Sequence, residues 1–538
     1  MSETDRHYAT IWEAIADRMP ERTALRHGDL VHTWRQFDDR AARLAAAFAA
    51  HGVGHQESVG NFLYNGPTYF ESFFAALKIR ARPFNVNYRY RGSELRQILD
   101  NAEAKALVYS AALRDRVASV IDDSPDLRLL VEVGDDPVGA PIPGALHLEE
   151  LLADTEPAPR VERSGADTYL NYTGGTTGLP KGVLVEIRRS MTTALWFRDQ
   201  YLGRTLDGDP VDTAMALAEA GDSLSSIPAS PIMHSVGFIF SSLPALLTGG
   251  TVTTLENHGF DAHELLATIE RTSATVTAIV GDAFGLPIVR ALDEGRPDGR
   301  PYDTSSLRVI SSAGVTWSAP IKARLLDHMP QVALIDACGS TEGVNYGTRT
   351  TRRGDALSSA NFVAAPGLKV LSPEGDELPA GEIGLLAGPT HGNGYHRNPV
   401  ETASTYLRLD GVQYAIPGDL GRVEPDGTVT LIGRGITTIN TGGEKVHPAE
   451  VEEVIKALPQ IDDCLVLGVP DERLGQRVAA LVVPTPGAVL ETEAIRAAVR
   501  ELVAGYKTPS RVLVIEQVPR APNGKVDYPA AQALFADA

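Results

Sequence analysis

Short apolar strands alternate with helices along most of the chain, and this order limits the fold more than any other feature of the sequence. Up to about Val161, strands are predicted at residues 58–63 and 106–109, and helices at residues 41–50 and 69–78. Further strands, each flanked by helical sequence, are predicted at residues 274–280, 307–311 and 332–336. A strand–helix–strand unit needs a crossover connection, which is right-handed and leaves its two strands parallel. The sequence therefore predicts an α/β fold with layered, largely parallel sheets.

The sequence changes character after Tyr414. Tight turns rich in Gly, Pro and Asp come first. Beyond Gly435, helices are predicted at residues 449–458 and 491–503, and strands at residues 464–469, 479–483 and 512–516. A chain of 538 residues is too long for one hydrophobic core. We predict a large multi-sheet N-terminal domain, residues 1–433, and a small C-terminal α+β domain, residues 434–538.

The charge and the cysteines of the chain exclude several classes of protein. A formal net charge of -20 argues against a surface for DNA or RNA and against a basic membrane-binding face. The two cysteines, Cys338 and Cys464, have neither CxxC spacing nor a neighbouring His pair, which excludes a disulfide framework and a zinc ribbon. The first residues are charged, and no apolar run reaches the roughly 18 residues of a membrane helix. We expect a cytoplasmic protein with no nucleic-acid partner and no integral membrane contact.

The segment Tyr172-Thr-Gly-Gly-Thr-Thr-Gly-Leu-Pro-Lys-Gly182 follows a short predicted strand, so its glycines lie in a loop at a strand end. Glycine lets main-chain amides approach an anion, threonine hydroxyls add donors, and Lys181 adds a positive charge. It is not a Walker loop, because Pro180 precedes the lysine and Gly182 follows it. We predict a phosphate-binding loop. Its binding residues are expected to be Thr173, Gly174, Gly175, Thr176, Thr177, Gly178 and Lys181.

This loop resembles the phosphate loop of the adenylate-forming (ANL) superfamily, which includes acyl-CoA synthetases, peptide-synthetase adenylation domains and beetle luciferases. The resemblance covers essentially the whole chain and is closest to the acyl-CoA synthetase and fatty-acid–CoA ligase branch. In Cys338-Gly-Ser-Thr-Glu-Gly343, it implies that Glu342 binds Mg²⁺ and that Thr341 contacts the α-phosphate. The chemistry fits, since Mg²⁺ prefers hard oxygen ligands that it shares with phosphates.

Two further motifs are similar to the parts of the family site that hold the ribose and the reacting groups. Asp419, in Pro417-Gly-Asp-Leu-Gly421, and Arg434 are implied to face the ribose hydroxyls. Lys525, in Arg520-Ala-Pro-Asn-Gly-Lys-Val526, matches the lysine that bridges the attacking carboxylate and the α-phosphate. A fixed cation at that point stabilises the charge that develops during nucleotidyl transfer.

The segment Thr441-Gly-Gly-Glu-Lys445 resembles the family loop that lines the pantetheine tunnel. The resemblance implies a mobile C-terminal domain, which removes the catalytic lysine after adenylation and brings this loop to the site. The coenzyme A-binding residues are then expected to be Gly442, Gly443 and Lys445, with Ile436 at the hinge. Lys445 is open to a second interpretation as a surface charge.

Other segments resemble the walls of the acyl pocket and the adenine cleft. His234, in Pro231-Ile-Met-His-Ser-Val-Gly237, is expected to be a gate and pocket wall, with a core histidine as the alternative. The acyl pocket is expected to contain His234, Val280, Ala283 and Gly314. The nucleotide site is expected to contain Ser312, Ala313, Gly314, Cys338, Gly339, Ser340, Asp419 and Arg434. Because several of these side chains are small, we expect room for a bulky acid.

Two positions depart from the family pattern. The family usually has an aromatic ring, on which adenine stacks, where this chain has Cys338. It also prefers a polar hinge residue where this chain has Ile436. Stacking on a ring typically contributes about 1–3 kcal/mol per base in nucleic-acid-binding proteins, so we expect weak ATP binding.

Together the motifs predict an acid–thiol ligase that uses ATP and Mg²⁺ to make an acyl-adenylate and passes the acyl group to coenzyme A. The expected catalytic residues are Lys525, Glu342, Thr341 and His234. The acid is expected to be long-chain, or a bulky lipid or terpenoid-like molecule. The alternatives are an enzyme that chiefly performs the thioester step on a supplied acyl-adenylate, and one that loads a carrier protein. A luciferase-type oxygenase, a non-catalytic binder and a homodimer are left open.

Overall fold

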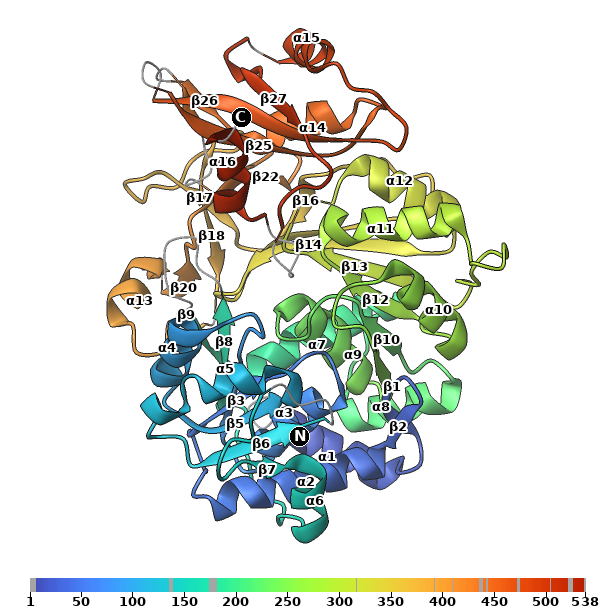
Figure 1. The fold of residues 1–538 in the computed structure, drawn as a ribbon, viewed down its shortest axis with the longest axis vertical. Coiled ribbons are helices and arrows are strands. Elements are labelled where there is room, and N and C mark those ends of the chain that lie inside the picture. The colour runs from blue at the N-terminus through green and yellow to red at the C-terminus, as the bar shows by residue number, and fades with distance from the viewer. Residues whose placement is uncertain are drawn as a thin grey trace.

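Three β-sheets and their covering helices form the part of the chain that the structure describes (Figure 1). It is a computed structural model that describes residues 6–134, 139–173, 181–315, 317–390, 392–409, 411–434, 439–441, 444–471, 475–503, 505–520 and 526–536. The predicted α/β class is confirmed. None of the described helices is long and apolar enough to cross a membrane.

The first sheet gathers the N-terminal strand–helix units in the order β7-β6-β5-β3-β4-β8-β9. Its strands are β3 (Ser58–Phe62), β4 (Arg82–Asn85), β5 (Ala104–Ser110), β6 (Leu129–Val133), β7 (Leu146–His147), β8 (Thr168–Thr173) and β9 (Lys181–Glu186). Neighbours from β7 to β8 are parallel, because helices such as α3 (Pro67–Lys78) and α4 (Gly92–Ala102) serve as crossovers. Only β8 and β9 are antiparallel, and the predicted phosphate loop joins them.

The second sheet has a parallel half and an antiparallel half. Its order is β2-β1-β11-β10-β12-β13-β14-β15-β16-β22-β21-β18-β20-β19, with β17 beside β18. The strands of the parallel half and its edge are β1 (Thr23–His27), β2 (Leu30–Thr33), β10 (Ser225–Pro228), β11 (Thr251–Thr254), β12 (Val276–Ile279), β13 (Val309–Ala313) and β14 (Ala333–Ser340). The antiparallel half contains β15 (Val344–Thr351), β16 (Asn361–Ala364), β17 (Lys369–Leu371), β18 (Gly384–Pro389), β19 (Tyr406–Leu409), β20 (Val412–Ala415), β21 (Asp419–Val423) and β22 (Thr428–Arg434). The change of direction comes at the hairpin between β14 and β15.

Helices with one apolar face cover both sheets. The remaining helices of this region are α1 (Tyr8–Arg18), α2 (Trp34–Ala50), α5 (Arg114–Ala118), α6 (Leu148–Asp154), α7 (Ile187–Leu202), α8 (Pro210–Ala220), α9 (Leu243–Leu246), α10 (Ala262–Thr272), α11 (Gly281–Glu294), α12 (Ala319–His328) and α13 (Pro399–Thr405). Helix α2 begins with a capping box, in which the Thr33 hydroxyl accepts from the Gln36 amide and the Gln36 side chain accepts from the Thr33 amide. A π-helical segment, Val236–Ser242, follows His234 and was not predicted.

The residues from 439 onward form a separate α+β unit at one end of the molecule (Figure 1). Its sheet has the order β24-β23-β26-β25, with β27 beside β26. The elements are β23 (Ile439–Thr441), β24 (Glu444–Val446), α14 (Pro448–Lys456), β25 (Ile461–Asp471), β26 (Gly475–Pro484), α15 (Thr492–Leu502), β27 (Arg511–Val514) and α16 (Tyr528–Ala536). The chain leaves the large sheet after Arg434 and enters this one at Ile439. We call it the C-terminal unit; the predicted domain division at residue 434 stays a prediction.

Candidate active site

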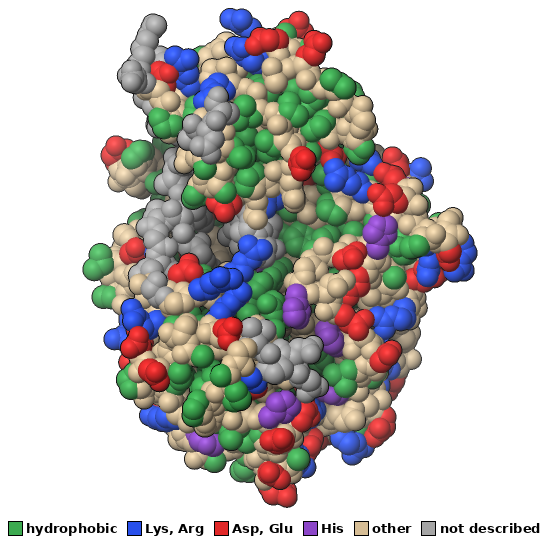
Figure 2. Space-filling view, viewed as in Figure 1, with side chains coloured by type: hydrophobic (Ala, Val, Ile, Leu, Met, Phe, Trp, Pro, Cys, Tyr) green, Lys and Arg blue, Asp and Glu red, His purple; other side chains and the backbone are tan. Residues whose placement is uncertain are grey.

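The carboxyl ends of parallel strands from the first two sheets meet at one edge. Strand β8 ends at Thr173 and β10 ends at Pro228. The Asn85 amide, at the end of β4, donates to the carbonyls of both Tyr172 and Met233, so the two edges are in contact. Ligands of open α/β sheets bind beyond such strand ends. Figure 2 shows a hollow between the upper and lower parts of the molecule, with apolar side chains in it and Lys and Arg side chains at its edge.

The predicted phosphate loop begins and ends at this edge. Its residues Gly174, Gly175, Thr176, Thr177 and Gly178 lie outside the described residues. The flanking residues Thr173 and Lys181 face each other as partners in the β8–β9 ladder. The Lys181 ammonium forms an ion pair with Glu401 of α13 and lies 5.5 Å from the centre of the Tyr395 ring. Glu401 and the Tyr395 ring therefore hold the lysine at the end of the loop. Anionic phosphates can bind the lysine in place of Glu401 or in addition to these contacts.

Glu342 and Thr341 lie in the tight turn between β14 and β15. Gly343 closes the turn at φ 86, a left-handed conformation that favours glycine. Glu342 is 9% exposed, and its Oε1 accepts a hydrogen bond of 2.7 Å from the Tyr395 hydroxyl. Burial, and then the charge of Glu342, raises the pKa of Tyr395 above its ordinary value. Because Tyr395 contacts both Lys181 and Glu342, the two predicted phosphate and metal ligands lie close together.

Asp419 and Arg434, which the sequence places in separate motifs, are direct partners in the β21–β22 ladder. Asp419 is 9% exposed, and its Oδ2 accepts a hydrogen bond of 2.7 Å from the Tyr346 hydroxyl. Burial, and then the Asp419 charge, raises the pKa of Tyr346, so this phenol stays a donor. The structure therefore brings the two predicted ribose-binding residues to one place on adjacent strands.

The predicted adenine wall lies on β13 and β14. The Ser312 hydroxyl accepts a hydrogen bond of 2.9 Å from the Gly281 amide, which links β13 to the start of α11. Cys338 is buried, and burial followed by the Asp419 charge raises the pKa of its thiol. A Cβ at Gly339 would lie 2.4 Å from the Val344 carbonyl oxygen, so the hairpin itself requires this glycine. Space for a ligand is therefore not the reason that residue 339 is small.

Neighbouring positions of this wall leave more room. Ala313, at the end of β13, is buried, and Ser340 ends β14 beside the Thr341 turn. A Cβ at Gly314 would meet only Val280, at 3.9 Å. Val280 is buried and Ala283 packs against the main core. Gly314 has a φ of 95, which favours glycine in any case, so the expectation of a roomy pocket stays a prediction.

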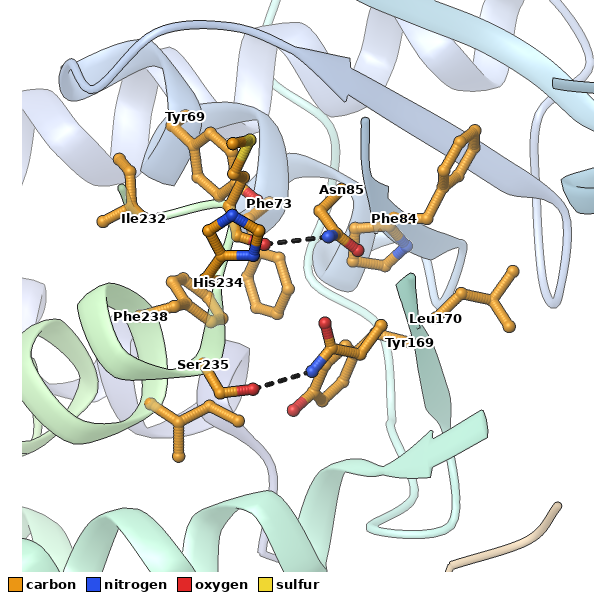
Figure 3. A pocket seen from close by; sticks show the side chains of 14 residues that line it. Tyr69, Phe73, Phe84, Asn85, Tyr169, Leu170, Ile232, His234, Ser235 and Phe238 are labelled. Carbon is orange, nitrogen blue, oxygen red and sulfur yellow. Dashed lines mark hydrogen bonds between the residues drawn. The ribbon is translucent and has the colours of Figure 1, made fainter. Parts of the chain in front are cut away.

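His234 lines an apolar cavity between the two sheets (Figure 3). The other lining residues are Tyr69, Phe73, Pro83, Phe84, Asn85, Tyr169, Leu170, Asn171, Ile232, Met233, Ser235, Phe238 and Ile239. Of the four residues predicted for the acyl pocket, only His234 lines this cavity; Val280, Ala283 and Gly314 do not. The cavity is therefore not the acyl pocket as the sequence predicts it, apart from His234.

The predicted coenzyme A loop and catalytic lysine fall mostly on residues that are not described. Lys525, Ile436, Gly442 and Gly443 lie outside the described residues. The main chain of Lys445 is described and pairs with Asn440 in the β23–β24 hairpin. The roles of all five residues stay predictions.

The sequence did not indicate the tyrosines that support the two predicted acids. Tyr346 and Tyr395 are 73 and 53 residues away from the acids that they contact. No local pattern marks Tyr346, since it is one more alternating residue in β15. Tyr395 lies in a Gly-rich stretch that pairs with β9, and that composition was the one available signal.

Comparison with known sequences covers both parts of the chain. The profile of the AMP-binding enzyme family matches residues 12–396, and that of the AMP-binding enzyme C-terminal domain matches residues 450–525. A 3-oxocholest-4-en-26-oate–CoA ligase of Rhodococcus rhodochrous is 36% identical over 97% of this chain and 94% of its own length. The medium-chain acyl-CoA ligase Mig of Mycobacterium avium is 34% identical over 98% of both chains.

Solved structures resemble the whole molecule. ATP-bound MatB from Rhodopseudomonas palustris is 25% identical, with a TM-score of 0.80 over 98% of this chain and 99% of its own. The anthranilate CoA ligase AuaEII, solved in complex with anthranoyl-AMP, has a TM-score of 0.84 over 100% of both chains at 23% identity. The second likeness is a likeness of fold.

Proposed function

The chain belongs to the AMP-binding enzyme family, and from this premise we propose that its active site activates a lipid-like carboxylic acid with MgATP for transfer to coenzyme A. It is an acid–thiol ligase of the acyl-CoA synthetase branch, with ATP, coenzyme A and an acid as its substrates. The observation that carries the proposal is the grouping of Lys181 and Glu342 around Tyr395, at the edge where the phosphate loop begins and ends.

In the first half-reaction, an oxygen of the acid attacks the α-phosphorus of ATP, the bond to the β-phosphate breaks, and pyrophosphate leaves. We assign the phosphates to Lys181 and the loop before it, and the α-phosphate to Thr341. Lys525 is assigned to the attacking carboxylate and the α-phosphate, where a positioned cation stabilises the developing charge. Asp419, already held by Tyr346, is assigned to the ribose hydroxyls, together with Arg434.

Glu342 has the chemistry that a magnesium ion needs. One oxygen of its buried carboxylate accepts the hydrogen bond from Tyr395. Mg²⁺ is usually bound by one or two carboxylates together with substrate phosphates. No three His, Cys, Asp or Glu residues within the described part of the chain form a metal site by themselves. The ion would neutralise phosphate charge during the transfer. Glu342 is then its one protein ligand in this proposal.

In the second half-reaction, the thiol of coenzyme A attacks the acyl carbon, AMP leaves, and the thiol proton passes to solvent. We assign Gly442, Gly443 and Lys445 to the pantetheine arm, after a rotation of the C-terminal unit about Ile436. His234 is assigned to the wall between the acyl group and the thiol. The apolar cavity at His234 has a volume of about 20 Å³, which is too small for an acyl chain, so this assignment rests on the resemblance of the His234 segment to the family.

The acid is proposed to be a medium- or long-chain fatty acid or a sterol side-chain acid. Relatives named for 3-oxocholest-4-en-26-oate and for medium-chain acyl groups support this class, as does the open space at Gly314. A panel of acetate, benzoate, dodecanoate, hexadecanoate and 3-oxocholest-4-en-26-oate tests it, with pyrophosphate release and ester formation measured separately. Turnover of acetate alone would contradict the substrate class.

Lys525 gives the sharpest test of the mechanism. In Lys525→Ala, pyrophosphate release is expected to fall about 10²–10³-fold, as when other transition-state charges are removed. Thioester formation from synthetic acyl-adenylate is expected to survive, since the lysine acts only in the first step. The matched control is Lys507→Ala, because Lys507 lies in the same unit and is paired with Glu450. Equal damage to both steps would overturn the assignment.

Cys338 bears on the strength of ATP binding. Its buried thiol offers no ring at the position where relatives of the superfamily stack adenine. Two rates of ester formation, from acid plus ATP and from synthetic acyl-adenylate, show how far Cys338 in place of a ring weakens adenylation. A much faster ester from synthetic acyl-adenylate than from acid and ATP would indicate an enzyme that chiefly performs the second step. Similar rates would indicate an ordinary two-step ligase.

A further inference from the structure

We propose that Asn85 is a positioning residue that couples the phosphate loop to the segment carrying His234, so that nucleotide binding fixes the wall of the acyl site. The inference rests on the proposed function, because it concerns communication between the nucleotide and acyl parts of the same site. The evidence for it is the set of hydrogen bonds that the buried Asn85 side chain makes.

Three asparagines lie at the carboxyl ends of β3, β4 and β8, and all of them contact residues 230–235. Asn65, after β3, accepts from the Ile232 amide at 2.9 Å and donates to the Ser230 carbonyl at 3.2 Å. Asn171 of β8 donates to the Ser235 hydroxyl at 2.9 Å. Together with Asn85, they hold the segment from the first sheet's side. Figure 3 shows the Asn85 contact beside His234 and a hydrogen bond to the Ser235 hydroxyl.

Asn85 differs from the other two because it binds the main chains of two segments at once. Its Oδ1 accepts from the Tyr172 amide at 2.7 Å, and its Nδ2 donates to the Tyr172 carbonyl at 2.9 Å. The same Nδ2 donates to the Met233 carbonyl at 2.8 Å. Asn85 is 8% exposed, so each main-chain group that lost this partner would be costly to leave unpaired.

These bonds join the two parts of the site directly. Tyr172 precedes Thr173, where the described chain enters the phosphate loop, and Met233 precedes His234. The His234 carbonyl in turn accepts from the Phe238 amide at 3.0 Å, at the start of the π-helical segment. Because the planar Asn85 amide binds both Tyr172 and Met233, a shift of the main chain at one of these residues also moves the main chain at the other. Phosphates that bind beside Thr173 therefore also constrain the His234 segment.

Asn61 provides a matched control within the same sheet. It is the direct partner of Asn85 in the β3–β4 ladder and is 1% exposed. Its Oδ1 accepts from the Ser72 hydroxyl of α3 at 2.6 Å, a contact away from the phosphate loop and from residues 230–235. Asn61→Ala therefore removes a buried amide from the neighbouring position, but leaves the proposed coupling intact.

The test follows the reaction of His234 with diethyl pyrocarbonate, site by site, by peptide mass spectrometry. Each protein is compared without nucleotide and at saturation with Mg²⁺ and α,β-methylene-ATP, whose α–β bridge cannot be cleaved by adenylation. Saturation is verified by calorimetric titration. His55 is the internal reference, because it is 53% exposed and lies at the opposite ends of the strands. No acid substrate is needed.

In the wild type, nucleotide is expected to slow the modification of His234 by about fivefold or more, the lower end of typical coupling between two sites. In Asn85→Ala this slowing is expected to vanish, whereas Asn61→Ala is expected to retain it. If Asn85→Ala does not fold, Asn85→Leu fills the same space and removes the same bonds. Equal slowing in wild type and in the Asn85 variants would mean that the nucleotide shields His234 directly, and would overturn the coupling. A wild type that does not bind the analogue would instead overturn the proposed function.

Discussion

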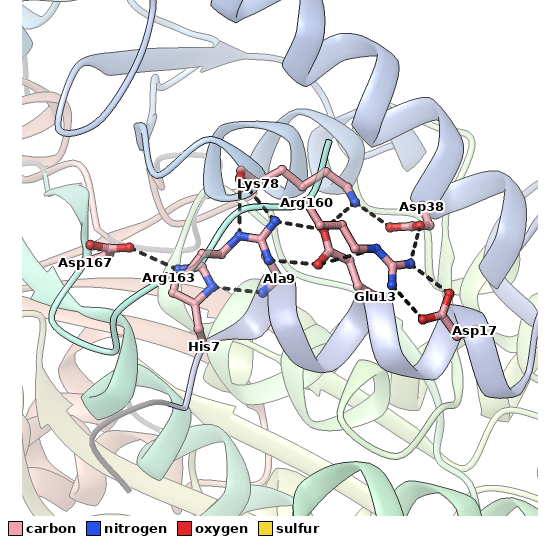
Figure 4. A network of polar contacts seen from close by, with 9 residues as sticks. All are labelled: His7, Ala9, Glu13, Asp17, Asp38, Lys78, Arg160, Arg163 and Asp167. Carbon is pink, nitrogen blue, oxygen red and sulfur yellow. Dashed lines mark hydrogen bonds and ion pairs between the residues drawn. The ribbon is translucent and has the colours of Figure 1, made fainter. Parts of the chain in front are cut away.

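Two networks of buried charge hold different parts of the molecule, and they differ in depth and in what they join. The amino-terminal charge network consists of Glu13, Asp17, Asp38, Lys78, Arg160 and Arg163 (Figure 4). The boundary charge network consists of Asp282, Arg290, Lys456, Asp462, Asp463 and Arg520. The first lies within the N-terminal region. The second joins that region to the C-terminal unit.

The centre of the amino-terminal charge network is the more deeply buried, although its rim residues Arg160 and Asp17 are 47% and 58% exposed. The side chains of Glu13, Lys78 and Arg163 are 5%, 4% and 2% exposed. The Arg163 guanidinium donates to both carboxylate oxygens of Glu13 at 2.8 Å, and the Lys78 ammonium lies 2.9 Å from one of these oxygens. Burial alone would raise the pKa of Glu13, but Arg163 and Lys78 outweigh it and hold that pKa below its ordinary value. The network fixes residues 160–163, just before β8 and the phosphate loop, to α1 and α3.

The centre of the boundary charge network is also largely buried, with the Asp282 side chain 7% exposed. The Lys456 ammonium of α14 lies 3.1 Å from Asp282 of α11 and 3.3 Å from Asp463 of β25. The side chains of Lys456, Asp463 and Arg520 are 11%, 13% and 15% exposed. Arg290 of α11 also forms an ion pair with Asp462 of β25. Two separate ion pairs therefore cross from α11 to the C-terminal unit.

The difference shows what buried charge is suited to in each place. A charge pair near solvent loses little when it breaks, because water replaces the lost partner. A deeply buried pair is costly to break, because the remaining charge stays in a medium that solvates it poorly. The amino-terminal charge network therefore suits a joint that stays closed. In the boundary charge network, Lys456 has a second carboxylate partner, Asp463, within its own unit, so the contact with Asp282 can break and re-form without leaving the lysine unpaired if the C-terminal unit turns as proposed.

The largest expected effect is the loss of a deep charge. In Glu13→Gln, Lys78 retains Asp38, but Arg163 loses its carboxylate while remaining 2% exposed. Leaving a buried charge unpaired typically costs about 3–5 kcal/mol, so the free energy of unfolding is expected to fall by that amount. Urea unfolding at neutral pH measures it.

The rim of the same network supplies the control. Asp17 pairs with Arg160, but its side chain is 58% exposed. Asp17→Asn is expected to cost less than about 1 kcal/mol, as exposed ion pairs do. A similar loss in both variants would show that depth does not separate the contacts, and would remove the basis of the comparison.

The next prediction concerns the dependence of stability on pH. His7 caps α1, where its Nδ1 accepts from the Ala9 amide at 3.2 Å. Burial, and then the charge of Arg163, lowers the pKa of His7 from 6.5 to about 3; Arg80 adds to this, and Asp167 and Glu13 oppose it. Below about pH 6.5 the unfolded chain takes up a proton that the folded chain takes up only near pH 3. The stability that neutral His7 provides is therefore full above pH 6.5 and is lost as the pH falls.

At pH 5 this difference amounts to about 2 kcal/mol, at roughly 1.4 kcal/mol for each pH unit below 6.5. His7→Asn keeps an N-cap acceptor and removes the titration, so it is expected to lose about 2 kcal/mol less stability than the wild type between pH 7 and pH 5. Urea unfolding at both pH values measures the difference. His55→Asn is the control, since His55 lies 3.6 Å from the same Asp167 but is 53% exposed. A slope unchanged in His7→Asn would contradict the assignment.

Sequence reasoning could address the chemistry that is carried by contiguous residues. The Gly- and Thr-rich loop before Lys181, and the turn that holds Glu342, are local patterns, and each pattern predicts its own ligand. The pairing of Asp419 with Arg434 could not be predicted, because it depends on the register of two strands. The supporting contacts of Tyr346 and Asn85 depend on residues more than 70 positions away.

The same limit applies to the joint between the two parts of the chain. Nothing near Asp282 in the sequence indicates that Lys456 is its partner, 174 residues away. Ion pairs of this kind follow from how folded units dock. The strand–helix order that predicts each unit contains no information about that docking.

The smallest expected change in stability, and the most direct test of the comparison, is Asp282→Asn. Asparagine can still accept at Oδ1 from the Ser318 amide, now at 2.8 Å, so the start of α11 is kept. What is lost is the pairing with Lys456, which retains Asp463. The free energy of unfolding is expected to change by only about 1 kcal/mol.

The effect on function is expected to exceed the effect on folding. A contact between the two units favours one orientation of the C-terminal unit, and each half-reaction is proposed to need its own orientation. Weakening the contact should therefore change the two half-reactions in opposite directions, and shift their ratio about fivefold. Pyrophosphate release measures the first step, and ester formation from synthetic acyl-adenylate the second. Asp293→Asn is the control, because Asp293 lies on the same helix but pairs with Arg324 and His328, inside the N-terminal region. If both steps slow together in Asp282→Asn, the contact supports the fold rather than the orientation of the C-terminal unit. Both charge networks would then only stabilise the folded chain.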